Sequence, residues 1–446
     1  FNDGNSGSQG SGGALTATGS TTVTITGVND APTITNLSGD SLAYSEGTGA
    51  VVIEQGANVL VADSDSSNFD TGTLTVSIPS GGDSAEDVLS IRNQGTGAGQ
   101  IGVSGSNVTY GGVTIGTFTG GSNGTSLVIT LNSSADATTV TALVKNITYA
   151  NTDTAAPTTG ARTVRYVLTD GDGGTSTNYD ATVTVSAVND APVLADSNLT
   201  FTVLEDAGAP VNGTAVGAPL SAFTGSVTDP DGAVAKGLAI ISSTETNGTW
   251  YYTTNAGATW LTVGAVSNSA SLLLADTAGT RLYFAPNSNY TGNVFPGLIV
   301  RAWDQSSGVV GTKVNTSVQG GTTAFSLVGD TLDPTVIAVN DAPVFSNLDG
   351  TPTFTEGGAA VVLDANVSIG DAELSALNNF NGATLTLARN GGATAEDVFS
   401  GSGTLSLTSG NVVVSGTTIG TYTNSGGTLQ FTFNGSATQT LVNSAI

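Results

Sequence analysis

One pentapeptide, Val-Asn-Asp-Ala-Pro, occurs three times in this chain and constrains its folding more than any other feature. The copies span residues 28–32, 188–192 and 339–343, so their starting points lie 160 and 151 residues apart. Each copy follows a run of alternating apolar and polar residues, which is typical of a β-strand with one buried face. Proline fixes φ and offers no N–H to a strand ladder, so it suits a position where strand pairing ends. We therefore interpret the three pentapeptides as linkers that separate folded modules.

The segments after the first and third linkers are copies of one module, whereas the segment between the second and third linkers differs. Residues 1–27 match the last part of the first copy. The chain ends at Ile446, near the counterpart of Ile147, so we expect the last copy to lack its final strands. The sequence therefore looks like an internal part of a larger protein. The matching stretches are Asn36–Gly39 with Asn347–Gly350, Ala85–Val88 with Ala395–Val398, and Thr114–Phe118 with Thr418–Tyr422.

These repeats predict the domain organisation. Residues 1–27 are expected to be the C-terminal strands of a truncated repeat. A module of one type covers residues 33–187, and a module of a second type covers residues 193–338. A truncated copy of the first type covers residues 344–446. The last three are called the first, second and third modules below.

Short strands account for nearly all of the secondary structure that the pattern predicts. Period-two runs such as Thr73–Ile78, Leu127–Leu131 and Thr163–Leu168 are separated by turns rich in Gly, Asn and Ser. Helical turns are expected only at residues 135–146 and, in the third module, at residues 437–443. Short strands at regular spacing favour an all-β fold of tandem Ig-like β-sandwich domains in an elongated array.

Charge and composition narrow the possible partners. Lys and Arg total 9 and Asp and Glu total 35, which gives a formal net charge of −26. Such a field repels nucleic acid and anionic lipid and attracts multivalent cations. The chain has no cysteine, so no disulfide can brace its modules. It shows no signal peptide and no apolar run of membrane-spanning length. We therefore expect no nucleic-acid partner and no membrane insertion in this segment.

Catalysis finds little support in the sequence. His and Cys are both absent, so the usual bases and thiol nucleophiles are missing. The pairs Glu86/Asp87 and Glu396/Asp397 could suggest a glycosidase, but adjacent residues on a strand point to opposite faces. Because the pairs recur in both copies of one module, we favour a structural role, with a metal site or a turn within the module as the alternative. We expect that the chain is not an enzyme.

The few acidic residues cluster near the ends of the modules. The clearest cluster, Asp63-Ser64-Asp65, follows a predicted strand directly. Alternate Asp residues on a short loop place two carboxylates on one side, and calcium prefers six to eight oxygen ligands. Two such groups that face each other across a linker would share cations and fix the angle between modules. Without a cation, the same carboxylates would repel one another and loosen the linker.

Together, the Asn-Asp-Ala-Pro linker and the Asp-x-Asp element resemble the cadherin-like, VCBS-type tandem repeats of giant bacterial surface adhesins. The resemblance extends over essentially the whole chain. It implies cadherin-like domains with several Ca²⁺ ions at their junctions, and an Asp-x-Asp pair that ligates from the domain after each linker. It also implies a secreted or cell-surface protein with a structural or adhesive role. The third pair departs from the pattern, because Glu373 stands where its second Asp would.

The resemblance implies a set of calcium ligands at each linker. At the first linker they are Asp3, Asn29, Asp30, Asp63 and Asp65. At the second linker they are Glu46, Asp170, Asp172, Asn189, Asp190, Asp229 and Asp231. At the third linker they are Glu205, Asp304, Asn340, Asp341, Asp371 and Glu373. The alternative interpretation is that these acidic turns only keep a β-rich surface soluble.

Two further functions stay open beside a calcium-stiffened stalk whose partners are neighbouring repeats of the same protein. Other copies of the chain could complete each other's truncated modules by strand donation and form an extracellular filament or sheath. The aromatic residues Trp250–Tyr252 and Trp260 could form a platform for surface glycans. A hairpin whose rings pack into the core is the favoured interpretation of these residues, and Trp303 is expected in the same core.

Overall fold

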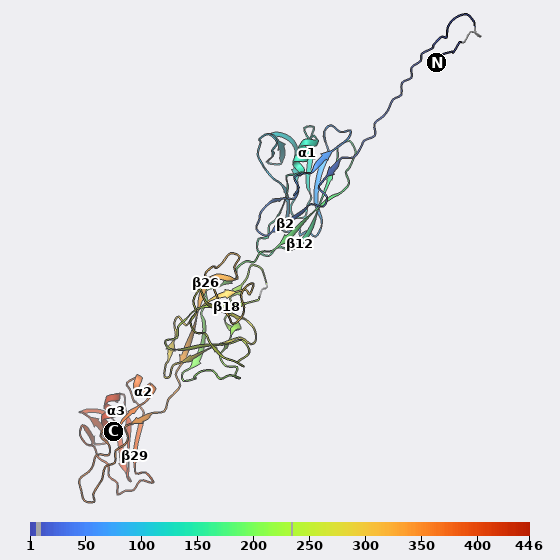
Figure 1. Cartoon of the computed structure of the whole chain (residues 1–446). Coiled ribbons are helices and arrows are strands. Elements are labelled where there is room, and N and C mark those ends of the chain that lie inside the picture. The colour runs from blue at the N-terminus through green and yellow to red at the C-terminus, as the bar shows by residue number, and fades with distance from the viewer. Residues whose placement is uncertain (6–9, 233–234) are drawn as a thin grey trace. The chain divides into compact units, whose positions relative to one another are not determined.

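The structure of the chain is a computed structural model that describes residues 1–5, 10–232 and 235–446 (Figure 1). β-Strands form most of its regular secondary structure, and the first and second modules each enclose a hydrophobic core of their own. The predicted all-β class of tandem β-sandwich domains is therefore confirmed. Each module is described on its own below.

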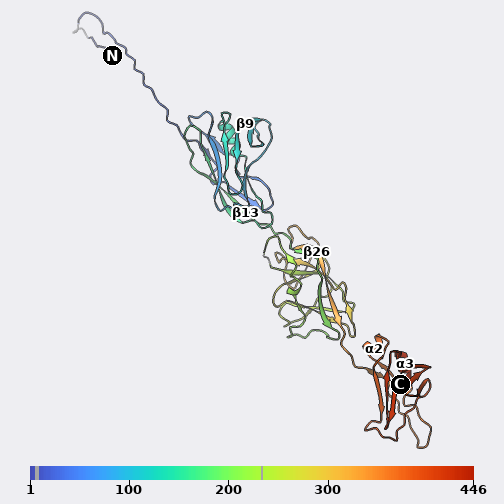
Figure 2. The ribbon, with the colours of Figure 1, turned by 180° about the vertical axis from the view of Figure 1, so that it is seen from behind.

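The first module is a sandwich of a large and a small sheet with one helix. Its elements are β1 (Thr33–Thr35), β2 (Ser41–Ser45), β3 (Val51–Val52), β4 (Leu60–Ala62), β5 (Thr73–Ser80), β6 (Asp87–Ile91), β7 (Ile101–Ser104), β8 (Asn107–Tyr110), β9 (Val113–Thr119), β10 (Leu127–Leu131), α1 (Ala137–Val144), β11 (Ile147–Asn151), β12 (Gly160–Leu168) and β13 (Tyr179–Ser186). The large sheet has the order β2-β13-β12-β5-β10-β9-β8-β7, and the small sheet has the order β3-β11-β6. Figure 2 labels β9 and β13 of the large sheet. β13 and β2 run parallel, whereas β13 and β12 are antiparallel.

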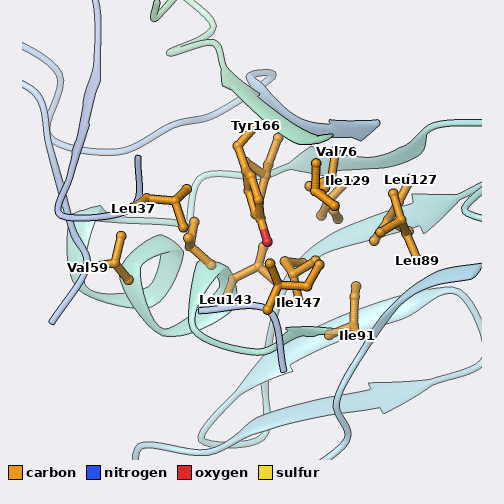
Figure 3. Packing of buried hydrophobic residues seen from close by; sticks show 14 of the residues in the cluster. Leu37, Val59, Val76, Leu89, Ile91, Leu127, Ile129, Leu143, Ile147 and Tyr166 are labelled. Carbon is orange, nitrogen blue, oxygen red and sulfur yellow. The ribbon is translucent and has the colours of Figure 1, made fainter. Parts of the chain in front are cut away.

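The alternation of residues decides which face of a strand is buried in this module. In β12, Val164, Tyr166 and Leu168 are fully buried, and the residues between them are partly exposed. Figure 3 shows Tyr166 together with Leu143 of α1 and Ile147 of β11 in the same core. Burial of an apolar side chain of this size contributes roughly 1.5–3 kcal/mol. The two sheets and the helix are therefore held by one shared core.

The two predicted helical turns are both confirmed. Helix α1 begins after Asp136, whose side chain accepts a hydrogen bond from the Thr139 N–H at 2.9 Å. Such a cap satisfies one of the N–H groups that the first helical turn leaves unpaired. The counterpart in the third module is α3 (Gln439–Ala445). The sequence pattern did not predict the short helix α2 (Ala372–Ala376).

The second module is a sandwich of different topology. Its elements are β14 (Val193–Leu194), β15 (Leu199–Leu204), β16 (Ala218–Pro219), the 3₁₀ turn η1 (Leu220–Ala222), β17 (Val227–Thr228), β18 (Gly237–Ser243), β19 (Gly248–Thr253), β20 (Leu261–Thr262), β21 (Ser271–Ala275), β22 (Arg281–Pro286), β23 (Gly292–Asn293), β24 (Leu298–Trp303), β25 (Lys313–Val314) and β26 (Phe325–Ile337). One sheet has the order β15-β26-β24-β18-β21-β25, and the other has the order β16-β22-β19-β20. β15 and β26 run parallel, as β2 and β13 do in the first module.

The third module has one main sheet. Its elements are β27 (Val344–Ser346), β28 (Ser368–Gly370), α2, β29 (Thr384–Ala388), β30 (Leu405–Thr408), β31 (Asn411–Val414), β32 (Thr417–Ser425), β33 (Thr428–Phe433) and α3. The sheet has the order β29-β33-β32-β31-β30. Equivalent residues form the same hydrogen bond in the first and third modules, which supports the match between them. In the first module Val61 N–H donates to Thr141 Oγ1 at 2.9 Å. In the third module Ile369 N–H donates to Asn443 Oδ1 at 3.0 Å.

Residues 1–27, for which strands are predicted, do not form a sheet in their described part. The structure has one isolated bridge there, between Asn2 and Thr16. Val23 and Ile25, which match the buried Val183 and Val185 of β13, are largely exposed. The strand pattern is therefore present in this segment without a strand partner.

Candidate metal centres at the linkers

All three linkers make the same backbone contact with the acidic pair of the following module. In each case the N–H of the linker Asp donates to the second carboxylate of the pair. The bonds are Asp30 to Asp65 Oδ2 (3.1 Å), Asp190 to Asp231 Oδ2 (2.8 Å) and Asp341 to Glu373 Oε1 (3.1 Å). The predicted association of each linker with the acidic pair that follows it is therefore present in the structure.

At the second and third linkers, a glutamate of the preceding module accepts a hydrogen bond from the first residue of the linker. Glu46 Oε2 accepts from the Val188 N–H at 2.9 Å, and Glu205 Oε1 accepts from the Val339 N–H at 2.6 Å. These glutamates follow β2 and β15, the strands that run parallel to β13 and β26. Because the parallel partner strand leads into the linker, the glutamate meets the linker as it leaves the module.

At the first linker, Asp63 and Asp65 lie on the turn after β4 as predicted. Asp63 Oδ1 accepts from the N–H groups of Asp65 at 3.2 Å and Ser66 at 3.0 Å. The Ser66 hydroxyl in turn donates to Asp172 Oδ2 at 3.4 Å. The turn between β12 and β13 is thus brought beside the acidic pair.

Asp170 is the most buried carboxylate of the first linker. Its Oδ2 accepts from Asn29 Nδ2 at 2.9 Å, and its Oδ1 accepts from the N–H groups of Asp172, Gly173 and Gly174 at 2.8–3.0 Å. Burial alone raises the pKa of this carboxyl. The hydrogen bonds lower the pKa by more than burial raises it, so the net pKa shift is downward. Asp170 therefore stays ionised beside the linker.

The expectation that Asp170 and Asp172 join the second linker is wrong. β12 and β13 are antiparallel, with Tyr166 opposite Tyr179. The turn with the two aspartates lies at that end of β13, whereas Ser186 at the other end leads into the second linker. Proximity in the sequence to the second linker therefore does not mean proximity in space, because the hairpin reverses the chain.

The same reversal makes the placement of Asp304 at the third linker wrong. Asp304 follows β24, and Trp303 of that strand pairs with Phe325 at the start of β26. Ile337, at the far end of β26, leads into the third linker. Twelve residues of extended chain span about 40 Å, so Asp304 lies at the opposite end of its module.

The third linker gathers five carboxylates. The pKa of Asp341 is raised, first by burial and then by the charges of Asp206, Glu373, Glu205 and Asp371. Asp206 is not among the predicted ligands, although its position beside Glu205 could have indicated it. Asp371 both belongs to the predicted pair and caps α2 by accepting from the Leu374 N–H. Negative charge is therefore concentrated at this linker without a basic residue among the groups that set the pKa.

The second linker shows a smaller version of the same repulsion. Burial and then the charge of Asp231 raise the pKa of Asp190. Asp229 Oδ1 accepts from the Asp231 N–H at 2.9 Å, so the pair forms the same tight turn as Asp63 and Asp65. Asn189 Nδ2 donates to the carbonyl of Asp190 at 3.0 Å, and Asn29 and Asn340 make the same bond at the other linkers.

Asp3 differs from the other predicted ligands. Its N–H donates to the carbonyl of Leu15 at 3.1 Å, and its Oδ1 accepts from the N–H of Leu15 at 2.9 Å. These contacts close a local loop within residues 1–27. The structure therefore associates Asp3 with its own segment instead of the first linker.

Each linker has a buried carboxylate oxygen that no hydrogen bond satisfies within the described part of the chain. The atoms are Asp63 Oδ2 at the first linker, Glu46 Oε1 at the second and Asp341 Oδ2 at the third. A buried charged oxygen without a partner is costly, and a hard divalent cation is the ligand that would satisfy it. As the side chains stand, no three acidic groups of the described residues converge closely enough to hold a metal ion. The donor chemistry fits a cation, and the carboxylates would have to move together to bind it.

The aromatic residues of the second module do not form an open platform. Trp250 is fully buried, and Tyr252 and Trp260 are more than nine-tenths buried. Trp260 Nε1 donates to the carbonyl of Thr214 at 3.0 Å, and its ring packs edge-on against Tyr283. The interpretation as a packed hairpin is confirmed for Trp250 and Tyr252, which lie in the main core of the module, whereas Trp260 belongs to a small cluster with Tyr283. Trp303 is buried as well, but in a separate cluster with Leu273 and Phe325.

Asp87, the second residue of the recurrent Glu-Asp pair, belongs to a buried ion pair of the first module. Its Oδ1 accepts from the Tyr149 hydroxyl and from Arg162 Nε at 3.4 Å, and the Arg162 side chain is fully buried. Glu86 accepts from the N–H of Thr158 at 2.9 Å. Glu86 and Asp87 therefore connect the start of β6 to β12 and to the segment that precedes it.

Comparison with known proteins yields distant structural likenesses. The chain matches no protein-family model and no curated protein sequence. It is similar to the endo-fucoidan hydrolase MfFcnA4 of glycoside hydrolase family 107 at 12% identity and a TM-score of 0.17, over 70% of this chain and 29% of that chain. It therefore spans less than a third of that protein.

Two further likenesses are to repeat domains. Drosophila N-cadherin EC1-3 matches at 9% identity and a TM-score of 0.15, over 70% of this chain and 69% of that one. The fibronectin(III)-like modules of Clostridium thermocellum CbhA match at 10% identity and a TM-score of 0.13, over 69% and 94%. At these TM-scores the likenesses carry no argument about function. Among the described residues, no helix combines the length and apolarity needed to cross a membrane.

Proposed function

We propose that this chain is a structural or adhesive segment of a large, secreted or cell-surface bacterial repeat protein, of the cadherin-like, VCBS type. Its linkers bind calcium, and bound calcium stiffens the junctions between modules. Its partners are the neighbouring repeats of the same protein. The segment takes no part in catalysis, nucleic-acid binding or membrane insertion.

The observation that carries the proposal is the unsatisfied carboxylate oxygen at each linker, on Asp63, Glu46 and Asp341. Glu46 itself accepts a hydrogen bond from the backbone of the second linker. Asp63 is paired with Asp65, which accepts one from the first linker, and Asp341 is a residue of the third linker. Calcium would supply the positive charge that these groups lack, and it accepts the irregular oxygen geometry that loops offer. The low-pKa carboxylate of Asp170 gives the first linker a ligand that is ionised at any physiological pH.

The full chain tests the proposal by thermal unfolding and small-angle scattering, with millimolar calcium and with chelator. We expect calcium to raise the unfolding temperature and to increase the maximum dimension of the particle. The triple variant Glu46→Gln, Asp63→Asn, Asp341→Asn should lose most of both effects and keep its fold. Superimposable wild-type curves with and without calcium would refute the calcium site and leave the repeat architecture in place.

A matched control separates ligation from net charge. The variant Glu245→Gln, Glu356→Gln, Glu396→Gln removes the same number of charges from exposed positions that lie at least thirteen residues from any linker in the sequence. It should keep the wild-type calcium response. An equal loss of response in both variants would mean that calcium acts by general screening.

The two alternative functions have different support. Trp250, Tyr252 and Trp260 are buried, so no observation favours a glycan platform on them. The filament has one favourable observation, since Val23 and Ile25 of residues 1–27 are exposed. Fibres that depend on protein concentration, and that vanish when residues 1–27 are deleted, would favour the filament.

A further inference from the structure

The edge strand β7 of the first module is covered by two side chains instead of by a neighbouring strand. β7 is the last strand of the large sheet and pairs only with β8. On its open side, the carboxamide of Asn93 donates to the Val103 carbonyl and accepts from the Val103 N–H, both at 3.2 Å. Gln94 Oε1 accepts from the Ile101 N–H at 3.1 Å, and the Gln94 N–H donates to the Ile101 carbonyl at 2.7 Å. Asn93 and Gln94, called the edge cover below, therefore take the place of the peptide groups of a further strand.

The sequence around β7 offers no other protection against strand pairing. Natural sheet edges are commonly protected by charged residues or by proline. Residues 93–135 contain no Asp, Glu, Lys, Arg or Pro, although the whole chain carries a formal net charge of −26. Two copies of the chain can therefore approach each other through this region with less electrostatic repulsion than through its acidic parts.

β7 is also complementary to itself. Ile101 is fully buried, and Val103 packs against the same core, so both side chains lie on one face of the sheet. In an antiparallel pair of β7 strands, Ile101 of one copy can lie opposite Val103 of the other and exchange both backbone hydrogen bonds with it. Such pairing would satisfy the same N–H and C=O groups that the edge cover satisfies. A second copy is therefore the partner that fits an uncovered β7.

Hydrogen bonds alone hold the edge cover on β7. Residues 93–97 are Asn-Gln-Gly-Thr-Gly, so they bring no apolar side chain to the core, and all of them except Gly95 are exposed. Arg92, directly before them, is fixed separately, because its Nε donates to Asn146 Oδ1 at 2.7 Å. Segments with few buried apolar contacts open locally at a low cost in free energy. The edge cover can therefore leave β7 while the core stays folded.

The edge cover needs a glycine on β7. A Cβ at Gly102 would lie 2.7 Å from the carbonyl oxygen of Gly95 and 2.5 Å from Thr109 Oγ1. The Gly95 oxygen belongs to the backbone, so a side chain at residue 102 would displace the segment that carries the edge cover. Gly102 therefore offers a way to open the edge without removing Asn93 or Gln94.

We propose that Asn93 and Gln94 form an autoinhibitory contact that keeps the edge of β7 closed against β7 of a second copy of this chain. When this contact opens, two β7 strands pair antiparallel and join the two large sheets edge to edge. The proposal involves neither the linkers nor calcium.

The test compares the full-length wild type with the variant Asn93→Ala, Gln94→Ala in the presence of chelator. At low protein concentration, amide hydrogen exchange at residues 101–104 should be roughly tenfold faster in the variant, because the N–H groups of Ile101 and Val103 lose their acceptors. At higher concentration this exchange should slow again, and sedimentation velocity should show dimers. The wild type should show slow exchange at residues 101–104 at every concentration.

Three further variants separate edge pairing from other effects. Gly102→Ala should reproduce fast exchange and dimer formation, because it displaces the edge cover from the side of β7. Gln55→Ala, Asn132→Ala is the matched control, since these carboxamides bond to Val52 and Thr114 instead of to β7. It should behave as the wild type does. Adding Ser104→Lys to the variant without the edge cover should abolish the dimer and leave the exchange fast, because it places a charge on the open edge.

Each remaining outcome would overturn the proposal. Unchanged exchange at residues 101–104 in Asn93→Ala, Gln94→Ala would show that the two side chains do not cover β7 in solution. Fast exchange without dimers at any concentration would show that the open edge does not accept a second copy. Dimers that persist with Ser104→Lys would assign the association to another surface. Exchange at residues 164–168 of β12 serves as the check that the core of each variant is folded.

Discussion

The N–H of Asp341 donates to Oε1 of Glu373 at 3.1 Å, the same contact that Asp30 makes with Asp65 at the first linker. Glutamate therefore replaces aspartate in the third pair without loss of the backbone bond, because its longer side chain reaches the linker from the start of α2. What differs at the third linker is the accumulated charge, which raises the pKa of Asp341.

The variant Glu373→Gln separates these two roles of the side chain. The amide oxygen can still accept from Asp341, so the third module should unfold in chelator at the wild-type temperature or slightly above it, with one repulsive charge removed. With calcium, the rise in unfolding temperature should be smaller than in wild type. Calorimetry of the full chain with Glu396→Gln as control measures both, and an unchanged calcium response would exclude Glu373 as a ligand.

Tyr166→Phe should stabilise the first module. The Tyr166 hydroxyl is buried without a hydrogen-bond partner among the described residues, beside Leu143 and Ile147 (Figure 3), and burial raises the pKa of Tyr166. An unsatisfied buried hydroxyl costs roughly 1–3 kcal/mol, so we expect a gain of about 1 kcal/mol in urea unfolding. Tyr149→Phe, which removes a donor to Asp87, should instead lose about 1–2 kcal/mol. Destabilisation by both variants would contradict the expected difference.

Two arginines on β12 should differ sharply in their effect on stability. Arg162 is fully buried against Asp87. Its removal leaves the buried carboxylate of Asp87 without a positively charged partner, which costs roughly 3–5 kcal/mol. Arg165 pairs with Asp180 at 2.8 Å, but both side chains are about one-third exposed, so its removal should cost at most about 1 kcal/mol. Denaturant unfolding of Arg162→Ala and Arg165→Ala compares them, and similar losses would show that the buried pair contributes no more than the surface pair.

The loop around Asp364 in the third module should become less stable in acid. Backbone hydrogen bonds from Asn366 and Gly350 are the main cause that lowers the pKa of Asp364 below its ordinary value of 3.8. A carboxyl with a depressed folded-state pKa stabilises the fold above its unfolded-state pKa, and this contribution is lost as the pH falls through the folded-state value. Amide exchange at residues 349–350 and 364–367 should therefore accelerate only below the ordinary carboxyl pKa. Asp364→Asn should remove that acid step, and persistence of the step in the variant would assign it to another group.

The parts of the fold that depend on local patterning could be predicted from the sequence. The strands of β5, β10 and β12 follow from period-two alternation, since one face of each is buried. The linkers follow from the repeated pentapeptide, and Glu46 and Asp65 contact them as expected. These features need only neighbouring residues, which the sequence displays directly.

The parts that depend on chain direction could not be predicted from the same patterns. Asp170 and Asp304 each precede a linker in the sequence, yet antiparallel pairing places them at the opposite end of the module. Asp206 adds its charge to the third linker beside Asp341, and only its position next to Glu205, not a motif, could have indicated this. Arg162 gave no sequence signal either, because a buried arginine on a strand looks like any exposed one until its partner Asp87 is known.

The parallel pairing of β2 with β13 has a consequence for a protein under tension. β2 lies near the start of the first module and β13 at its end, and they are in register from Ser41–Thr182 to Ser45–Ser186. When the two ends of the module are pulled apart, parallel neighbours are drawn in opposite directions along their length. The hydrogen bonds between them are then sheared together instead of being peeled open one at a time. β15 and β26 repeat the arrangement in the second module, so each complete module resists stretching through the strand that leads into its linker.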